Sequence, residues 1–243
     1  MYLLTWTPVV CSKKGFPKKE DGTPYLPGKL LKEAVESAFI YYYIKKDKEI
    51  ENKVRTYLLI EALKPEEVVE RIKDIIYEKY EVIRQVKFPE EIPLKQEGLR
   101  QELVEVFDLE RWRDVREYRL EVFKGVVEFD MSLEDLERFK PACHSYAEAL
   151  VKMERSLLKD HPLVERFYNP LSSKIKNWKL PLRVGMWTEV KYRGNLLFFW
   201  RIKDVRERLI RDYGIDIQPK EVLFLPKERV TVGWCELTDD LSQ

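Results

Sequence analysis

The chain contains 243 residues, of which 44% are hydrophobic and 36% charged, and its formal net charge is only +1. This composition excludes a disordered chain, because burial of the apolar side chains can offset the loss of chain entropy. It also excludes a membrane-spanning helix, since the longest apolar stretches (residues 38–44 and 196–200) fall far short of the roughly 18 residues that a span needs.

The N-terminal part of the sequence predicts one strand followed by helices. Apolar and β-branched residues alternate weakly at the start, and a Lys-, Gly- and Pro-rich loop then leads into apolar residues at helical spacing. In chain order, we expect a strand over 2–10, a loop over 12–24, a turn over 25–28, and helices over 30–39, 50–63 and 65–82.

The remaining sequence predicts strands interleaved with helices. Gly125 marks a turn or bulge, and Ser132 is a good cap for a short helix. In chain order, we expect strands over 103–107 and 118–130, a helix over 146–158, a loop or strand edge over 182–191, a buried strand over 196–200, a helix over 203–213, and strands over 222–224 and 229–237.

This interleaving predicts an α+β fold in a single domain over residues 1–243. The two helices after residue 50 separate the first strand–helix pair from the next group of strands. We therefore expect a helical insertion around residues 50–95.

Cysteine usage indicates a reducing compartment. Cys11, Cys143 and Cys235 are far apart and form no C-x-x-C pair, so we expect neither disulfides nor a zinc site, and a cytoplasmic protein. The chain has 30 Glu against nine Asn plus Gln, a pattern typical of proteins from hot environments. No cofactor motif is present, and we expect no metal or small-molecule cofactor.

The near-zero net charge conceals three blocks of charge. Residues 1–33 carry a charge of +3, residues 61–172 carry −7, and residues 174–211 carry +8. A polyanion responds to the local face that it meets, so the two basic blocks are candidate nucleic-acid contacts. The alternative for residues 203–211 is the solvated side of a surface helix.

Catalytic signatures are scarce. The sequence has no P-loop, no G-x-S-x-G and no H-E-x-x-H motif, and His144 and His161 are the two histidines. We expect structural roles for both, although one of the two is what a metal-independent nuclease would most naturally use as a general base.

Three segments in this order resemble the RAMP superfamily, the RRM- and ferredoxin-like subunits of type III CRISPR effector complexes. Residues 21–32 (DGTPYLPGKLLK) resemble the family's "G-x-P-Y-I-P-G" start of the first helix, and residues 182–187 (LRVGMW) resemble its glycine loop. Residues 224–229 (FLPKER) and 232–237 (VGWCEL) resemble its C-terminal ending. The match is most similar to the Csm-type terminal subunit, which caps the 3′ end of the guide RNA.

The resemblance implies a ferredoxin-like, antiparallel RAMP fold and an RNA-binding subunit that docks on neighbouring effector subunits in antiviral defence. A turn that ends in Pro27-Gly28 presents free N–H groups at a helix start, which suits a phosphate, although it can also serve only to shape the turn. The candidate RNA-binding residues are Lys13, Lys14, Lys18, Lys19, Lys29, Lys32, Arg183, Trp187, Lys191, Arg193, Lys227 and Arg229. Trp187 is the candidate for base stacking.

The resemblance further implies that the chain does not cut RNA. Target-cutting subunits of the family carry a catalytic Asp shortly before the Pro-Gly turn, but residues 5–8 here are TWTP and no acid precedes Glu20. The alternative is a repeat-processing CRISPR endoribonuclease of the same superfamily that uses His144. Its usual glycine-rich C-terminal motif is reduced here to Gly233.

Overall fold

The computed structural model describes residues 1–61, 63, 65–81, 86–131, 136–186, 194–214, 216 and 219–241. The strands are β1 (Tyr2–Thr5), β2 (Tyr25–Pro27), β3 (Glu91–Pro93), β4 (Leu99–Asp108), β5 (Arg113–Phe123), β6 (Val126–Glu128), β7 (Leu180–Arg183), β8 (Glu221–Leu225), β9 (Val230–Thr231) and β10 (Trp234–Thr238). The α-helices are α1 (Gly28–Lys46), α2 (Lys48–Leu59), α3 (Pro65–Lys79), α4 (Leu136–Leu158), α5 (Asn169–Lys174), α6 (Gly194–Trp200) and α7 (Lys203–Tyr213). A 3-10 turn (Gln96–Gly98) precedes β4, and a π-helical turn (Val164–Tyr168) precedes α5.

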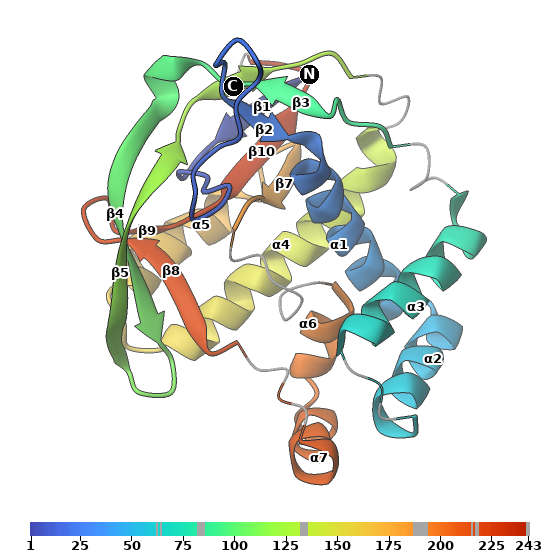
Figure 1. The fold of residues 1–243 in the computed structure, drawn as a ribbon. Coiled ribbons are helices and arrows are strands. Elements are labelled where there is room, and N and C mark those ends of the chain that lie inside the picture. The colour runs from blue at the N-terminus through green and yellow to red at the C-terminus, as the bar shows by residue number, and fades with distance from the viewer. Residues whose placement is uncertain are drawn as a thin grey trace.

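A four-stranded antiparallel sheet in the order β6-β1-β10-β7 forms the centre of the fold. The first and last strands of the chain are neighbours in it, with Tyr2 opposite Thr238 and Thr5 opposite Cys235. The two chain ends therefore lie close together at one edge of the molecule (Figure 1).

The arrangement of this sheet resembles that of a ferredoxin-like fold. The chain runs from β1 into α1 and, after the first strands of the second sheet, into β6; α4 then leads toward β7, and β10 finally pairs between β1 and β7. Helices α1 and α4 pack against each other, and α4 also packs against β7. The predicted α+β, antiparallel RAMP-like fold is confirmed.

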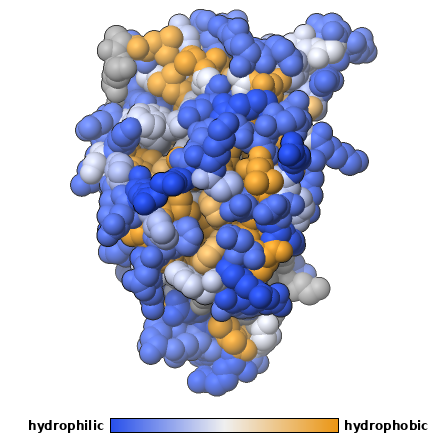
Figure 2. All heavy atoms as spheres, turned by 90° about the vertical axis from the view of Figure 1, so that its left-hand side faces the viewer, coloured by the Kyte–Doolittle hydropathy of each residue, from blue (hydrophilic) through white to orange (hydrophobic). Residues whose placement is uncertain are grey.

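A second sheet, in the order β5-β4-β8-β9, is joined to the first by two strands that continue across. β5 passes into β6 through Lys124 and Gly125, and β9 passes into β10 through Val232 and Gly233. The first of these crossings confirms the turn expected at Gly125. The long β4–β5 hairpin forms one side of the molecule (Figure 1). Its face shows apolar groups between many charged ones (Figure 2).

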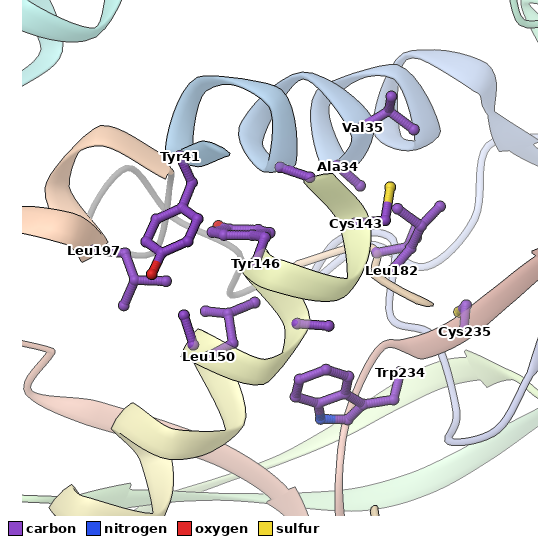
Figure 3. Close-up of a cluster of buried hydrophobic side chains, with 14 of the residues drawn as sticks. Ala34, Val35, Tyr41, Cys143, Tyr146, Leu150, Leu182, Leu197, Trp234 and Cys235 are labelled. Carbon is purple, nitrogen blue, oxygen red and sulfur yellow. The ribbon is translucent and has the colours of Figure 1, made fainter. Parts of the chain in front are cut away.

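The hydrophobic core lies between the central sheet and the helices. Ala34 and Val35 of α1 meet Cys143 of α4 and Leu182 of β7, while Tyr41, Tyr146 and Leu197 pack together nearby (Figure 3). Helix α1 is buried along much of its surface because α4 and α6 cover it on different sides. A smaller cluster around Val104, Val122 and Leu223 fills the space between the second sheet and Val10.

Helices α2 and α3 occupy most of the range expected for a helical insertion, between α1 and β3. They begin and end within four residues of the helices predicted over 50–63 and 65–82. Helix α7 confirms the helix predicted over 203–213. Within the described ranges, no helix is long and apolar enough to cross a membrane.

The strand predicted over residues 196–200 is wrong, because these residues belong to helix α6. A short apolar run carries no periodicity that separates a buried strand from a buried helix. Leu197 and Phe199 pack in the core beside α1. A strand and a helix at this place would both need apolar side chains, so composition alone does not distinguish them.

Several other element boundaries also differ from the expectation. The strand expected over 229–237 is divided between the two sheets, because Gly233 adopts a positive φ of 85°. The helix expected over 146–158 begins ten residues earlier, at Leu136, and contains Pro141. The expected cap at Ser132 lies outside the described residues.

A buried ion pair connects the two sheets to α4. The Arg183 guanidinium, on β7, bonds the carboxylate of Glu154, and their side chains are 5% and 1% exposed. The Tyr168 hydroxyl donates to Glu154 at 2.6 Å, and the Trp234 indole donates to Thr231 Oγ1 at 3.1 Å. Burial and the Glu154 charge raise the pKa of Tyr168 well above its ordinary value, so its hydroxyl stays a donor.

Removing one partner of this pair should strongly destabilise the fold. We expect Arg183→Met to lower the free energy of unfolding by about 3–5 kcal/mol, because Glu154 would be left buried without its cation. Denaturant unfolding monitored by circular dichroism measures the change. The double variant Arg183→Met/Glu154→Leu should recover much of the loss. Equal instability of the single and double variants would contradict this account.

Candidate RNA interface

The Pro27-Gly28 turn presents the start of α1 next in the chain to a loop that carries half of the candidate lysines. The Gly28 N–H donates to the Glu90 carbonyl at 3.0 Å, and a Cβ at Gly28 would overlap the Pro89 carbonyl oxygen. Glycine is therefore required here by the close approach of the chain before β3. The first turn of α1 has no acidic residue and no side-chain cap, so no carboxylate of that turn offsets the positive end of the helix, whose first N–H is bonded to Glu90.

The lysine-bearing loop over residues 12–24 is held against the second sheet. The Phe16 ring is buried, and its N–H donates to Glu121 Oε2 at 2.9 Å. Gly15, at a φ of 88°, passes close to the same carboxylate. Lys14 and Lys18 are exposed on this loop, and the Lys13 ammonium lies 4.9 Å from the centre of the Tyr118 ring. A fixed loop thus presents these cations together.

Two of the candidate lysines are paired with carboxylates. Lys19 Nζ lies 3.5 Å from Glu91, and Lys32 Nζ lies 3.8 Å from Glu36. Glu36 is buried and also contacts Tyr77 and Lys73, so its charge is shared. Lys29, at the start of α1, is exposed. Lys14, Lys18 and Lys29 are therefore the exposed lysines at this end for which the structure gives no carboxylate partner among the described residues.

The structure corrects the expectation for Arg183. Its guanidinium is buried with Glu154 and lies 5.3 Å from the centre of the Trp234 ring, so it has a structural role and does not reach a surface. Burial of an Arg requires a partner, and Glu154, 29 residues away in the sequence, supplies it.

The glycines of two family-like segments serve chain packing. Gly185, at a φ of 104°, lies against the Val10 carbonyl, and Gly233 lies against the Val184 carbonyl. Backbone hydrogen bonds join Met186 to Val10 at 2.7 Å and Val184 to Gly233 at 2.7 Å. These glycines thus allow three chain segments to cross closely.

Lys227 and Arg229 lie on the turn between β8 and β9, and both are exposed. The turn is fixed by a hydrogen bond from the Arg229 N–H to the Leu225 carbonyl at 2.8 Å. Between them, Glu228 pairs with Arg100 and Lys124, which anchors the turn to the second sheet. The turn therefore offers two cations of its own.

The basic block over residues 174–211 does not form one surface. Lys174 and Lys176 lie at the end of α5, beside the central sheet, whereas Lys203 and Arg208 lie on α7, which extends from the opposite end of the molecule (Figure 1). On α7, Lys203 pairs with Glu207 at 3.6 Å and Arg208 pairs with Asp212 at 3.4 Å. The predictions for Trp187, Lys191 and Arg193 fall outside the described residues.

His144 lies within α4 and not near a helix start. Its Nε2 atom is buried and has no hydrogen-bond partner in the described part of the chain. The neighbouring Cys143 thiol is fully buried, which raises its pKa to about 12 and favours the neutral form. Among the described residues, no three His, Cys, Asp or Glu side chains are grouped in a way that could hold a metal ion.

His161 is a neutral ring in an aromatic pocket. It lies 4.8 Å from Phe107 between ring centres, and its Nδ1 accepts a hydrogen bond from the Leu163 N–H at 3.2 Å. Burial lowers the pKa of His161 below its ordinary value, against a smaller opposing effect of Asp114. The expected structural role agrees with this setting. Because the pKa of the ring is lowered, His161 does not favour the protonated form that would interact well with the C-terminal end of a helix.

The structure also brings together an exposed aromatic–cation pair that the sequence did not indicate. Trp6 follows β1 and is 39% exposed, and the Lys174 ammonium lies 3.6 Å from the centre of its ring. The two residues are far apart in the sequence. The sequence placed Trp6 only within the strand expected over 2–10 and gave no signal of its contact with Lys174.

Comparison with known proteins gives a relative of unknown role and a shared fold. No known protein-family model matches the chain. An uncharacterized protein of Aquifex aeolicus (strain VF5) is 42% identical over 99% of this chain and 100% of its own length. A chain in the cryo-EM structure of a Csm–crRNA–target RNA ternary complex of a type III-A CRISPR-Cas system has a similar fold, with a TM-score of 0.53 and 17% identity. That match covers 92% of this chain and 75% of the other. Csm5 of T. onnurineus aligns with a TM-score of 0.46 and 12% identity over 90% of this chain and 72% of its own, which is too low to support an argument.

Replacement of Gly233 should destabilise the protein far more than replacement of Gly22, although both have a φ of 85°. For Gly233→Ala we expect a loss of about 3 kcal/mol or more in the free energy of unfolding, because a Cβ would overlap the Val184 carbonyl as well as strain the backbone. Gly22 has nothing within 4 Å of a Cβ, so Gly22→Ala should cost only about 1–2 kcal/mol. Chemical denaturation measures both. Equal losses would contradict a packing role for Gly233.

Stability should fall as the pH drops below the ordinary pKa of histidine. Because the pKa of His161 is lowered in the folded state, the unfolded chain binds its proton first, and stability is lost from about pH 6.5 downward. We expect His161→Phe, which keeps an aromatic ring beside Phe107, to flatten this dependence between neutral and mildly acidic pH. Denaturant midpoints of both proteins across that range test it, and an unchanged slope would count against the assignment.

Proposed function

Since this chain belongs to one family with the Aquifex aeolicus protein and has the RAMP-like fold of a chain in a Csm–crRNA–target RNA complex, we propose that it is a type III CRISPR effector subunit that binds guide RNA without cutting it. It would cap the backbone at the 3′ end of the guide, dock on a neighbouring backbone subunit and act in antiviral defence in the cytoplasm. The observation that carries the proposal is this fold combined with a fixed loop of exposed lysines beside the start of α1.

The lysine loop supports a contact with RNA phosphates. Lys14 and Lys18 are exposed, and Lys29 stands at the uncapped start of α1. A helix start with free N–H groups attracts phosphate, and nearby ammonium groups add to that attraction. Contacts of this kind position an RNA strand and carry little sequence information.

Two features support a binding role over cleavage. Residues 5–8, which match the region where target-cutting subunits carry an acid, contain no carboxylate, and the exposed side chain there is that of Trp6. The Nε2 atom of His144 is buried, so it could not meet a scissile phosphate without a movement of the side chain.

The acidic block over residues 61–172 supports contacts with protein neighbours. It covers α3, the β4–β5 hairpin and α4, of which β5 lies against the lysine loop through Glu121 and Tyr118. Its −7 charge would repel RNA, and we propose that the effector subunits beside this chain contact it there.

Binding to single-stranded RNA should weaken steeply with salt. We expect the logarithm of the association constant to fall with the logarithm of the salt concentration by about 0.7 per phosphate contacted. Fluorescence anisotropy with labelled RNA at several salt concentrations measures the slope. Affinity that is unchanged by salt, or absent both for the isolated chain and for the assembled complex, would overturn the proposal.

Charge reversal of loop lysines should weaken RNA binding, whereas the same charge reversal on α4 should not. We expect Lys14→Glu/Lys18→Glu to reduce affinity by tenfold or more (about 1.4 kcal/mol per tenfold), because two attractions to phosphate become repulsions. The matched control Lys140→Glu/Lys152→Glu makes the same change of net charge at exposed positions of α4 and should have little effect.

A cleavage assay distinguishes the alternative function. If the chain cleaves a repeat RNA without metal, and if His144→Ala abolishes that cleavage, the protein is the repeat-processing endoribonuclease and this proposal is overturned.

A further inference from the structure

Trp6 is an exposed indole on a well-anchored stretch of backbone. Its N–H donates to the Trp234 carbonyl at 2.9 Å, and the Thr7 N–H donates to the same oxygen at 3.1 Å. On the other side, the Thr5 N–H and hydroxyl both bond the Gly125 carbonyl. The exposed position of Trp6 is therefore fixed by hydrogen bonds of its own and the adjacent backbone to Trp234 and Gly125, and does not result from a loose chain end.

The indole has a fixed neighbour beside it and a movable one over its face. The Trp178 ring, only 4% exposed, lies 5.3 Å from Trp6 between ring centres, at 31° between the planes. The Lys174 ammonium lies 3.6 Å from the Trp6 ring centre, on an exposed side chain at the end of α5. A cation–π contact at an exposed site is weak, so Lys174 can leave it at little cost.

The surroundings favour a polyanion over an apolar protein surface. Lys174 places a cation on the open face of Trp6, and Lys176 and Asn177, two and three residues further along the chain, are exposed as well. Aromatic side chains beside basic ones form the common platform for unpaired nucleotides, since every base has a face that can stack and every phosphate needs a cation.

We propose that Trp6 and Lys174 form a site for one unpaired nucleotide of an RNA strand, in which the base stacks on the indole face. Lys174 leaves that face as the base arrives and pairs with the adjacent phosphate. The inference rests on the proposed RNA binding and assigns it a stacking position, separate from the lysine loop in sequence.

The test is a titration of the full chain with a short oligouridylate, followed by tryptophan fluorescence and by anisotropy of labelled RNA. We expect Trp6→Ala to lower affinity about 5- to 150-fold and to remove the quenching caused by stacking. Trp6→Phe should retain part of the affinity. Lys174→Ala should reduce the salt slope by about 0.7. Trp112→Ala, at the other exposed tryptophan of the described chain, should leave the quenching in place.

The outcomes separate this inference from the proposed function. If the wild-type chain binds RNA in a salt-dependent manner and Trp6→Ala binds equally well, the stacking site is wrong and the proposed function stands. If Trp6→Ala keeps its RNA affinity but loses an effector subunit on co-purification, Trp6 is a protein contact and the inference is overturned. If neither the wild-type chain nor its complex binds RNA, both proposals fail. A thermal melt of Trp6→Phe confirms that the fold is retained.

Discussion

The bond between Arg183 and Glu154 is the interaction on which the architecture depends. It joins β7 of the central sheet to α4, and through Tyr168 and Thr231 it reaches the strand that enters from the second sheet. Buried charges are tolerated only when they are paired and hydrogen-bonded, so the positions of α4, β7 and β9 are fixed relative to one another. A core of apolar side chains alone would permit several relative placements of the two sheets, because apolar contacts have no direction.

Near this ion pair, residues 8–10 pack against two chain segments that are remote in sequence, around Gly185 and Gly233. The carbonyl of Val10 meets Gly185, and Gly233 meets both the Pro8 carbonyl and Val184. These crossings leave no room for a Cβ, and they hold both the Trp6 backbone and the start of the lysine loop. The surface proposed to meet RNA is thus shaped by contacts beneath it.

Much of the fold could be predicted from the sequence because its amphipathic patterns are long. Helices α2, α3 and α7 have three or more turns, over which a 3.6-residue period is unmistakable. Residues 196–200 are too few to show any period, and a helix resulted where a strand was expected. The candidate site was harder, since neither the burial of Arg183 nor the contact between Trp6 and Lys174 follows from local sequence. Both depend on partners at least 29 residues away in the chain, and no single-sequence pattern encodes such a pairing.

The place of β1 in the central sheet has a consequence for the order of folding. β1 lies between β6 and β10, and β10 is the last strand of the chain. During synthesis β1 emerges well before β10, so it lacks one of its two neighbours until β10 has also left the ribosome. Contacts of such long sequence separation slow folding, since loop-closure entropy is lost before the pairing is gained. The helices around α1 and α4 can form beforehand, whereas the central sheet closes only after β10 has emerged.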